Sequence, residues 1–327
     1  MAPDASPPGS APGNDRSAGD SLFEASAFER RIASGAPRRW MGWHRRALTL
    51  AALLGCVGLI ALARWLAETP MIDLRLAAGT HGEPVLQRSP LPALTAHEGR
   101  TLQAIGRPGA ERVEVDALLL HPSPRWQADD DRRLRQREQH EAVAALLRGG
   151  GQVTLHFADG ATAEAAVEAR GYGRLGVGFW PLAAVALLLY LFAGVLLLAR
   201  PQPRTLLFTT MSLAQAGNAV YMAVESGAGI GLPPGTLALE LPIRALLDLC
   251  TAAAALNLFV LHPRPLRWSA PLAAAGWALV PAWAAAYAAG LGPSWWLAQA
   301  GCGLASAAAL AVASHSHRVE PDPYALV

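Results

Sequence analysis

Three charged side chains, Glu240, Arg244 and Asp248, lie four residues apart in the stretch LELPIRALLDLC, which opens an otherwise apolar segment. This spacing places them along one face of a helix, where the arginine can bridge both carboxylates. Counting back ~20 residues from Leu261 puts the hydrocarbon boundary near Pro242, with Glu240 at the membrane surface and Asp248 roughly 9 Å deep. A charge at that depth must be paired and turned away from lipid.

Two interpretations of this charged face stay open. In the first, it forms a ligand-sensing or proton-sensing site near the outer leaflet. In the second, it is an intrahelical ion pair that fixes the rotation and packing of the helix. The preceding apolar segment carries Gln215, Asn218 and Glu225 in a single stripe, and such side chains need partners within lipid. They predict either interhelical hydrogen bonds or a pocket shared with Asp248.

The chain shows no pattern that predicts catalysis or metal binding. It contains no phosphate-binding glycine loop and no serine nucleophile motif. Cys56, Cys250 and Cys302 all lie in apolar segments, without the spacing of a metal site or a disulfide framework. We therefore expect no enzyme activity, no catalytic residue, no cofactor and no metal. Pro281, in the middle of a later apolar segment, predicts a helix kink.

Membrane helices must position these side chains. Of the 327 residues, 52% are hydrophobic and 16% are charged, which is too apolar for a wholly soluble protein. The formal net charge of +2 is too small to favour nucleic acid as a partner. The expected fold is an all-α membrane bundle, with six transmembrane helices in total and an inserted small α+β domain.

The beginning of the chain predicts a tail and an anchor. Residues 1–46 are expected to form a disordered, basic cytoplasmic tail, because large apolar residues are scarce at first and six arginines follow in pairs. The apolar run over 47–67 is then the first transmembrane helix, with its charged end held in the cytoplasm. The stretch from Met41 also has the form of a cleavable signal peptide. With either interpretation the next segment is exported.

Residues 68–176 are predicted to form a small extracytoplasmic α+β domain. Alternating apolar residues predict half-buried strands around 72–76, 113–115 and 153–157. Asp159-Gly160 predicts a tight hairpin turn into a returning strand. Residues 128–151 begin with aspartates and end with glycines, the pattern of a helix with its start and stop signals.

Residues 177–314 contain consecutive apolar segments, and the length of each is close to the ~20 residues that a membrane-spanning helix needs. Five helices are predicted there, over 177–199, 205–225, 238–261, 268–290 and 294–314. Arginines occur only in alternate loops, which gives one topology by the positive-inside rule. Both termini, including a stub over 315–327, are then cytoplasmic, and the α+β domain is periplasmic in a bacterial inner-membrane protein.

The order of these parts resembles the input half of bacterial sensor histidine kinases of the competence-type quorum-sensing kind. In that family, a PDZ-like extracytoplasmic loop precedes a helical bundle and then cytoplasmic kinase domains. The segments HPSPRW (121–126), GLPPG (231–235) and HPRPLR (262–267) are similar to those of proteobacterial members. The resemblance implies a homodimeric sensor that acts with a cytoplasmic kinase or response regulator. This sequence itself contains no phosphoacceptor or ATP-binding motif.

A membrane signal-sensing module is therefore the expected function. The candidate signal-binding residues are Asp248, Arg244, Glu240, Gln215, Asn218 and Glu225. Two other functions stay open: a small-solute or proton-coupled transporter or channel, and an exported binding or scaffold domain for which the helices are only an anchor. Besides membrane lipid, the expected partners are a second copy of the chain and the cytoplasmic protein named above.

Overall fold

The first helix is longer than its apolar run. The computed structural model describes residues 38–107, 112–199, 202–227, 229–232, 235–261, 268–291 and 294–319, so most of the expected tail lies outside it. Helix α2 (Arg38–Ala67) begins where the composition predicts a tail. Arginine has a high helix propensity and no proline interrupts this stretch, so the helix extends back beyond the apolar run.

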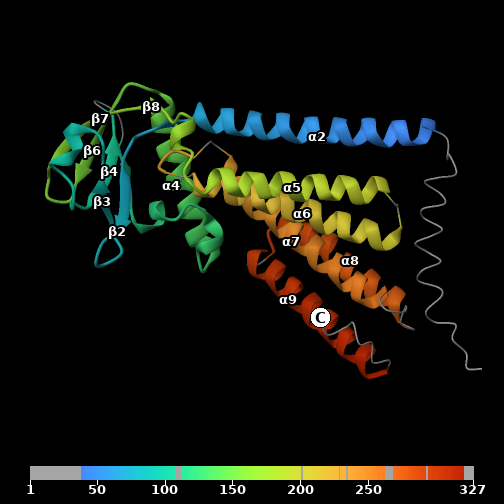
Figure 1. The fold of residues 1–327 in the computed structure, drawn as a ribbon. Coiled ribbons are helices and arrows are strands. Elements are labelled where there is room, and N and C mark those ends of the chain that lie inside the picture. The colour runs from blue at the N-terminus through green and yellow to red at the C-terminus, as the bar shows by residue number, and fades with distance from the viewer. Residues whose placement is uncertain are drawn as a thin grey trace, which may run out of the picture. The chain divides into compact units, whose positions relative to one another are not determined.

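Five further long helices follow the domain that α2 leads into (Figure 1). They are α5 (Phe179–Ala199), α6 (Pro203–Ser226), α7 (Thr236–Leu261), α8 (Ser269–Ala288) and α9 (Ser294–Val319). Helix α9 continues through residues 315–319, which the sequence assigns to a polar stub. No proline occurs there to end the helix, and the remainder of the stub lies outside the described residues.

Within the described residues, five helices are long and apolar enough to cross a membrane. Their candidate spans are Gly42–Ala67, Phe179–Leu198, Thr236–Leu261, Ser269–Ala288 and Ser294–Ser316. Helix α6 is absent from this set although it has 24 residues, because its middle carries polar side chains such as Gln215 and Asn218. The described chain thus has the character of a multi-pass membrane protein with a helical bundle.

Helix α7 is the centre of this bundle, since it packs against α6, α8 and α9, while α5 packs against α6. Small residues allow close approach of the helices. A Cβ atom added at Gly276 of α8 would lie 3.1 Å from Leu256 of α7. One added at Gly301 of α9 would lie 3.1 Å from Leu249 of the same helix. Substitution of either glycine would therefore require the leucine side chain that it meets to shift by a few tenths of an ångström.

The chain between α2 and α5, residues 68–176, folds into a small α+β unit that we call the sheet domain (Figure 1). Its main antiparallel sheet has the strand order β5 (Val113–Glu114), β4 (Leu102–Gly106), β6 (Gln152–Phe157) and β7 (Thr162–Ala166). Two antiparallel ribbons pair β2 (Arg75–Ala78) with β3 (Pro84–Arg88), and β1 (Pro70–Met71) with β8 (Glu168–Ala169). The helical elements are α3 (Pro92–Thr95), α4 (Asp130–Arg148), and the short helices η1 (Ala117–Leu120), η2 (Pro124–Trp126) and η3 (Tyr172–Arg174).

Local chemistry explains the hairpin and the long helix of the sheet domain. At the turn between β6 and β7, Gly160 has φ +83°, a conformation that glycine adopts without strain. The Asp159 carboxylate accepts a hydrogen bond from the backbone N–H of Ala161 at 3.0 Å. Asp129 caps α4, since its carboxylate accepts the backbone N–H of Arg132 at 2.7 Å.

The apolar core of the sheet domain includes one residue from the helical part of the chain. Leu86, Leu102, Leu147 and Leu155 are fully or almost fully buried in this core. Ile230 packs into the same cluster, although it belongs to the loop between α6 and α7. Because burial of apolar surface is the main favourable term in folding, the sheet domain and the helices stabilise each other through this shared core.

His140 of α4 is buried within the sheet domain. Burial lowers its pKa to about 4, against a smaller opposite effect from the nearby backbone of His121 and Leu118. The folded protein therefore holds this imidazole neutral, while the unfolded chain binds a proton below about pH 6.5.

We predict that the protein loses stability as the pH falls from about 6.5 to about 4, because only the unfolded chain takes up this proton in that range. The contribution of His140 over the whole interval is roughly 3 kcal/mol. Thermal unfolding of the full chain in detergent at a series of pH values measures it. His140→Leu should flatten this dependence, and His81→Leu, at an exposed turn, should not. Equal slopes for both variants would contradict the assignment.

Candidate functional site

Four polar side chains form a buried cluster where the sheet domain meets the helices. We call Ser123, Glu225, Glu240 and Arg244 the charge cluster. The Arg244 side chain and the Glu240 side chain are each 2% exposed. Nη1 of Arg244 donates hydrogen bonds to Oε1 of Glu225 and, at 3.4 Å, to Oε1 of Glu240. The Ser123 hydroxyl donates to the same Glu240 oxygen.

Three elements bring the charge cluster together. Glu240 and Arg244 lie one helical turn apart near the start of α7, and Glu225 lies in the last turn of α6. The chain reverses direction between the two helices, so the end of α6 lies beside the start of α7. Ser123 caps η2, where its oxygen accepts the backbone N–H of Arg125 at 3.3 Å. This leaves its hydroxyl hydrogen for Glu240.

The charge cluster holds two carboxyl groups against one guanidinium group. Burial of a charge is costly unless partners replace the lost water, and Arg244 obtains such partners from two helices. Because Glu225 and Glu240 both approach the same nitrogen, the two carboxylates also repel each other. Removal of Arg244 therefore leaves two carboxyl groups without a cation in a place with little access to water.

The expected bridge from Arg244 to Asp248 is not formed. Among the described side chains, Arg244 pairs with Glu225 and Glu240 instead. Oδ1 of Asp248 accepts a hydrogen bond from Nδ2 of Asn218 at 2.8 Å. The reason is tertiary: α6 places a carboxylate beside the arginine and an amide beside the deeper aspartate. Sequence spacing along α7 contains no information on either contact.

Asp248 belongs to a row of polar contacts that we call the polar seam, formed by Gln215 and Asn218 of α6 with Asp248 and Thr251 of α7. Nε2 of Gln215 donates to Oγ1 of Thr251 at 3.0 Å. The Thr251 hydroxyl donates in turn to the backbone oxygen of Leu247 at 2.9 Å. The sequence left two alternatives open for the polar side chains of α6: hydrogen bonds between helices or a pocket shared with Asp248. The contacts of Gln215 and Asn218 are hydrogen bonds between helices.

Counting residues along the helix predicted that Glu240 lies at the membrane surface, but in the structure its side chain is buried. The loop around Ser123 covers it, so this side chain is buried between the sheet domain and α7. Ser123 is itself fully buried, and its hydroxyl cannot meet a substrate from water without movement of the loop. Pro281 lies inside α8 with an exposed side chain, outside both the charge cluster and the polar seam.

A second junction joins the sheet domain to the α6–α7 loop. Arg170 is 2% exposed, and its guanidinium donates to the backbone oxygens of Gly227 and, at 3.2 Å, Gly231. Burial lowers the pKa of Arg170. Gly231 has φ +99°, and a Cβ atom there would lie 2.8 Å from Leu147 of the sheet domain. The loop is therefore held tightly against α4.

A third contact lies at the start of α9. The indole Nε1 of Trp296 donates to the backbone oxygen of Ala128 at 2.8 Å. The Arg133 guanidinium lies 5.8 Å from the centre of the same indole ring. No pattern in the sequence predicted this contact or a role for Ser123 and Arg170. The only available signal for Ser123 was the proline-rich segment HPSPRW, which carried no information on its partner.

The arrangement supports ion pairing and a connection between the sheet domain and the helices. Among the residues that the structure describes, no three His, Cys, Asp or Glu side chains gather in a way that could hold a metal ion. Comparisons with protein-family models, curated proteins and solved structures gave no match.

We predict that Arg244→Met destabilises the protein by roughly 3–5 kcal/mol, because it leaves two buried carboxyl groups facing each other without a cation. Thermal unfolding in detergent, followed by circular dichroism, measures the loss. Arg135→Met, at an exposed position on α4, is the matched control and should change little.

The combined variant Glu225→Gln, Arg244→Met, Glu240→Gln removes all three charges and should recover much of that stability. An Arg244→Met protein that unfolds at the wild-type temperature would show that the cluster does not hold the helices together.

Proposed function

We propose that this protein is a bacterial inner-membrane signal sensor, the input part of a two-component sensor histidine kinase system. In this proposal the sheet domain is a PDZ-like periplasmic domain, and the helices pass its state to a cytoplasmic kinase or response regulator. The observation that carries the proposal is the hydrogen bond from Ser123 of the sheet domain to Glu240 of α7. It connects an extramembrane domain to the most central helix of the bundle.

Three of the contacts between the sheet domain and the helices support mechanical coupling. Ser123 contacts α7, Arg170 holds the α6–α7 loop, and Ile230 of that loop packs in the core of the sheet domain. A change in the sheet domain therefore displaces the end of α6 and the start of α7 together. Because α7 also contacts α8 and α9, the displacement reaches the rest of the bundle.

The polar seam supports counting α6 as a sixth span. The chain that crosses in α5 must return before it crosses again in α7, and α6 lies between these two candidate spans. Asn218 and Gln215 give α6 its lower hydropathy, yet both direct hydrogen bonds to α7 rather than to lipid. Their polarity is thus satisfied inside the bundle.

Labelling of single cysteines tests the proposed topology. In a chain whose three native cysteines are replaced by alanine, Thr80→Cys in the sheet domain should react with an impermeant maleimide in intact spheroplasts. Arg318→Cys, near the end of α9, should react only after lysis. The opposite pattern would place the sheet domain in the cytoplasm and contradict an exported sensor domain.

Ser123→Ala tests the coupling, since it removes one hydrogen bond and no bulk. We predict faster amide hydrogen exchange not only at the start of α7 but also in its far half, over residues 251–261, and in α9. Thr80→Ala, at an exposed turn, is the control and should leave these helices unchanged. If the effect of Ser123→Ala stays within η2 and the first turns of α7, the sheet domain does not drive the bundle.

Solute uptake by vesicles that contain this chain alone is the corresponding test for a transporter. Uptake that Asp248→Asn abolishes would replace the sensor proposal with transport.

A further inference from the structure

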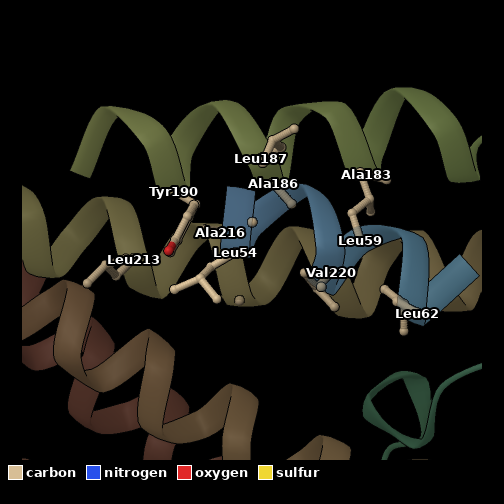
Figure 2. A pocket seen from close by; sticks show the side chains of 13 residues that line it. Leu54, Leu59, Leu62, Ala183, Ala186, Leu187, Tyr190, Leu213, Ala216 and Val220 are labelled. Carbon is tan, nitrogen blue, oxygen red and sulfur yellow. The ribbon is translucent and has the colours of Figure 1, made fainter. Parts of the chain in front are cut away.

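A groove between α2, α5 and α6 lies away from the charge cluster and has no role in the proposed function. Its volume is about 440 Å³, within the range of about 300–1,000 Å³ that accommodates small-molecule ligands. Apart from Tyr190, its lining residues are all Leu, Gly, Ala or Val. Figure 2 shows the Tyr190 hydroxyl pointing toward Leu54 and Leu213, with Ala186 and Ala216 beside the same space.

Glycines on α2 explain why the groove exists. At Gly55, an added Cβ atom would lie 2.9 Å from both Leu187 and Tyr190, so α2 touches α5 closely there. At Gly58, one turn on, an added Cβ atom would meet no atom within 4 Å, although this residue lines the groove. Helix α2 thus lies close to α5 at Gly55 and packs with it again around Ala63 and Leu66, and unfilled space remains beside the stretch between these contacts.

The groove has the depth of one membrane leaflet. Along α2 it extends from Leu54 to Leu62, which corresponds to roughly 12 Å at the rise of an α-helix. Half of a hydrocarbon core is about 15 Å thick. Arg64 and Trp65, both exposed, follow directly toward the sheet domain and are residue types that anchor helices at the lipid headgroups.

The contacts that bound the groove favour a lipid chain over a helix from a second copy. Helix α2 lies close to α5 at Gly55 and packs with it again through Ala63 and Leu66, so a helix about 10 Å across cannot lie between them without displacing α2. An acyl chain is far thinner, is apolar along its length, and is the solvent at this depth. Empty space would leave the lining side chains without packing partners, which costs dispersion energy.

We propose that the groove binds one acyl chain of a phospholipid from the leaflet on the side of the sheet domain. The chain then fills the space between α2 and the α5–α6 pair, and α2 packs on the bundle partly through lipid. This site depends on the membrane character of the helices and does not depend on the signalling function proposed above.

Photolabelling tests the site in the full-length protein. The chain is reconstituted in vesicles of phosphatidylethanolamine and phosphatidylglycerol with a trace of phosphatidylcholine that carries a diazirine midway along one acyl chain. After irradiation, mass spectrometry maps the labelled peptides. We expect labelling around Leu54, Tyr190 and Leu213 to exceed by several-fold that of the exposed α9 peptide around Leu310. Uniform labelling of all lipid-facing helices would overturn the proposal.

An added Cβ atom at Gly58 meets no atom within 4 Å, so Gly58→Leu should fill the groove and remove most of the labelling there. Gly303→Leu on α9, where an added Cβ atom also meets nothing within 4 Å, is the matched control and should keep it. Ala186→Leu fills the same space from α5 and gives a second test if the first variant folds poorly. Labelling that survives both fillings would overturn the site.

Two further results would also overturn it. If a diazirine-bearing free fatty acid labels the groove and the phospholipid does not, the occupant is not a bilayer phospholipid. If irradiation instead couples α2 of one copy to α5 or α6 of another, as shown by a covalent dimer, the groove is an interface between copies.

Discussion

The buried guanidinium of Arg244 is the constraint on which the arrangement of this protein depends. A cation in a place with little water must find anionic partners, and here they come from the end of α6 and the start of α7. Pairing with Glu225 fixes these two helices against each other. Pairing with Glu240 turns that carboxylate toward Ser123, so the same charge also determines where the sheet domain sits on α7.

The polar side chains inside the helical part are explained by their hydrogen-bond partners on neighbouring helices. Helix α6 is too polar to join the five candidate spans, but its amides contact Asp248 and Thr251 of α7. The charge cluster and the polar seam therefore form one continuous α6–α7 contact. It begins under the sheet domain and ends within the bundle.

The sheet domain is not an independent unit attached by a tether. Ile230 packs in its core, and Arg170 donates hydrogen bonds to the backbone of the α6–α7 loop that contains this residue. A domain that shares its core with a helical hairpin cannot change its packing without moving that hairpin. By contrast, a groove lined almost wholly by apolar residues lies beside α2, and in our proposal an acyl chain fills it.

The sequence by itself determined the features that depend on neighbouring residues. Apolar length predicted the long helices, the Asp159-Gly160 turn predicted the hairpin, and the aspartates and glycines around α4 predicted its ends, because spans, turns and caps are local. Only the tertiary structure decided that Arg244 pairs with Glu225 rather than Asp248. It also decided that Ser123 covers Glu240 and that Arg170 holds the α6–α7 loop. These partners lie far apart along the chain. A buried charge pairs with groups that are close to it in space, and the spacing of residues along one helix gives no information on such distances.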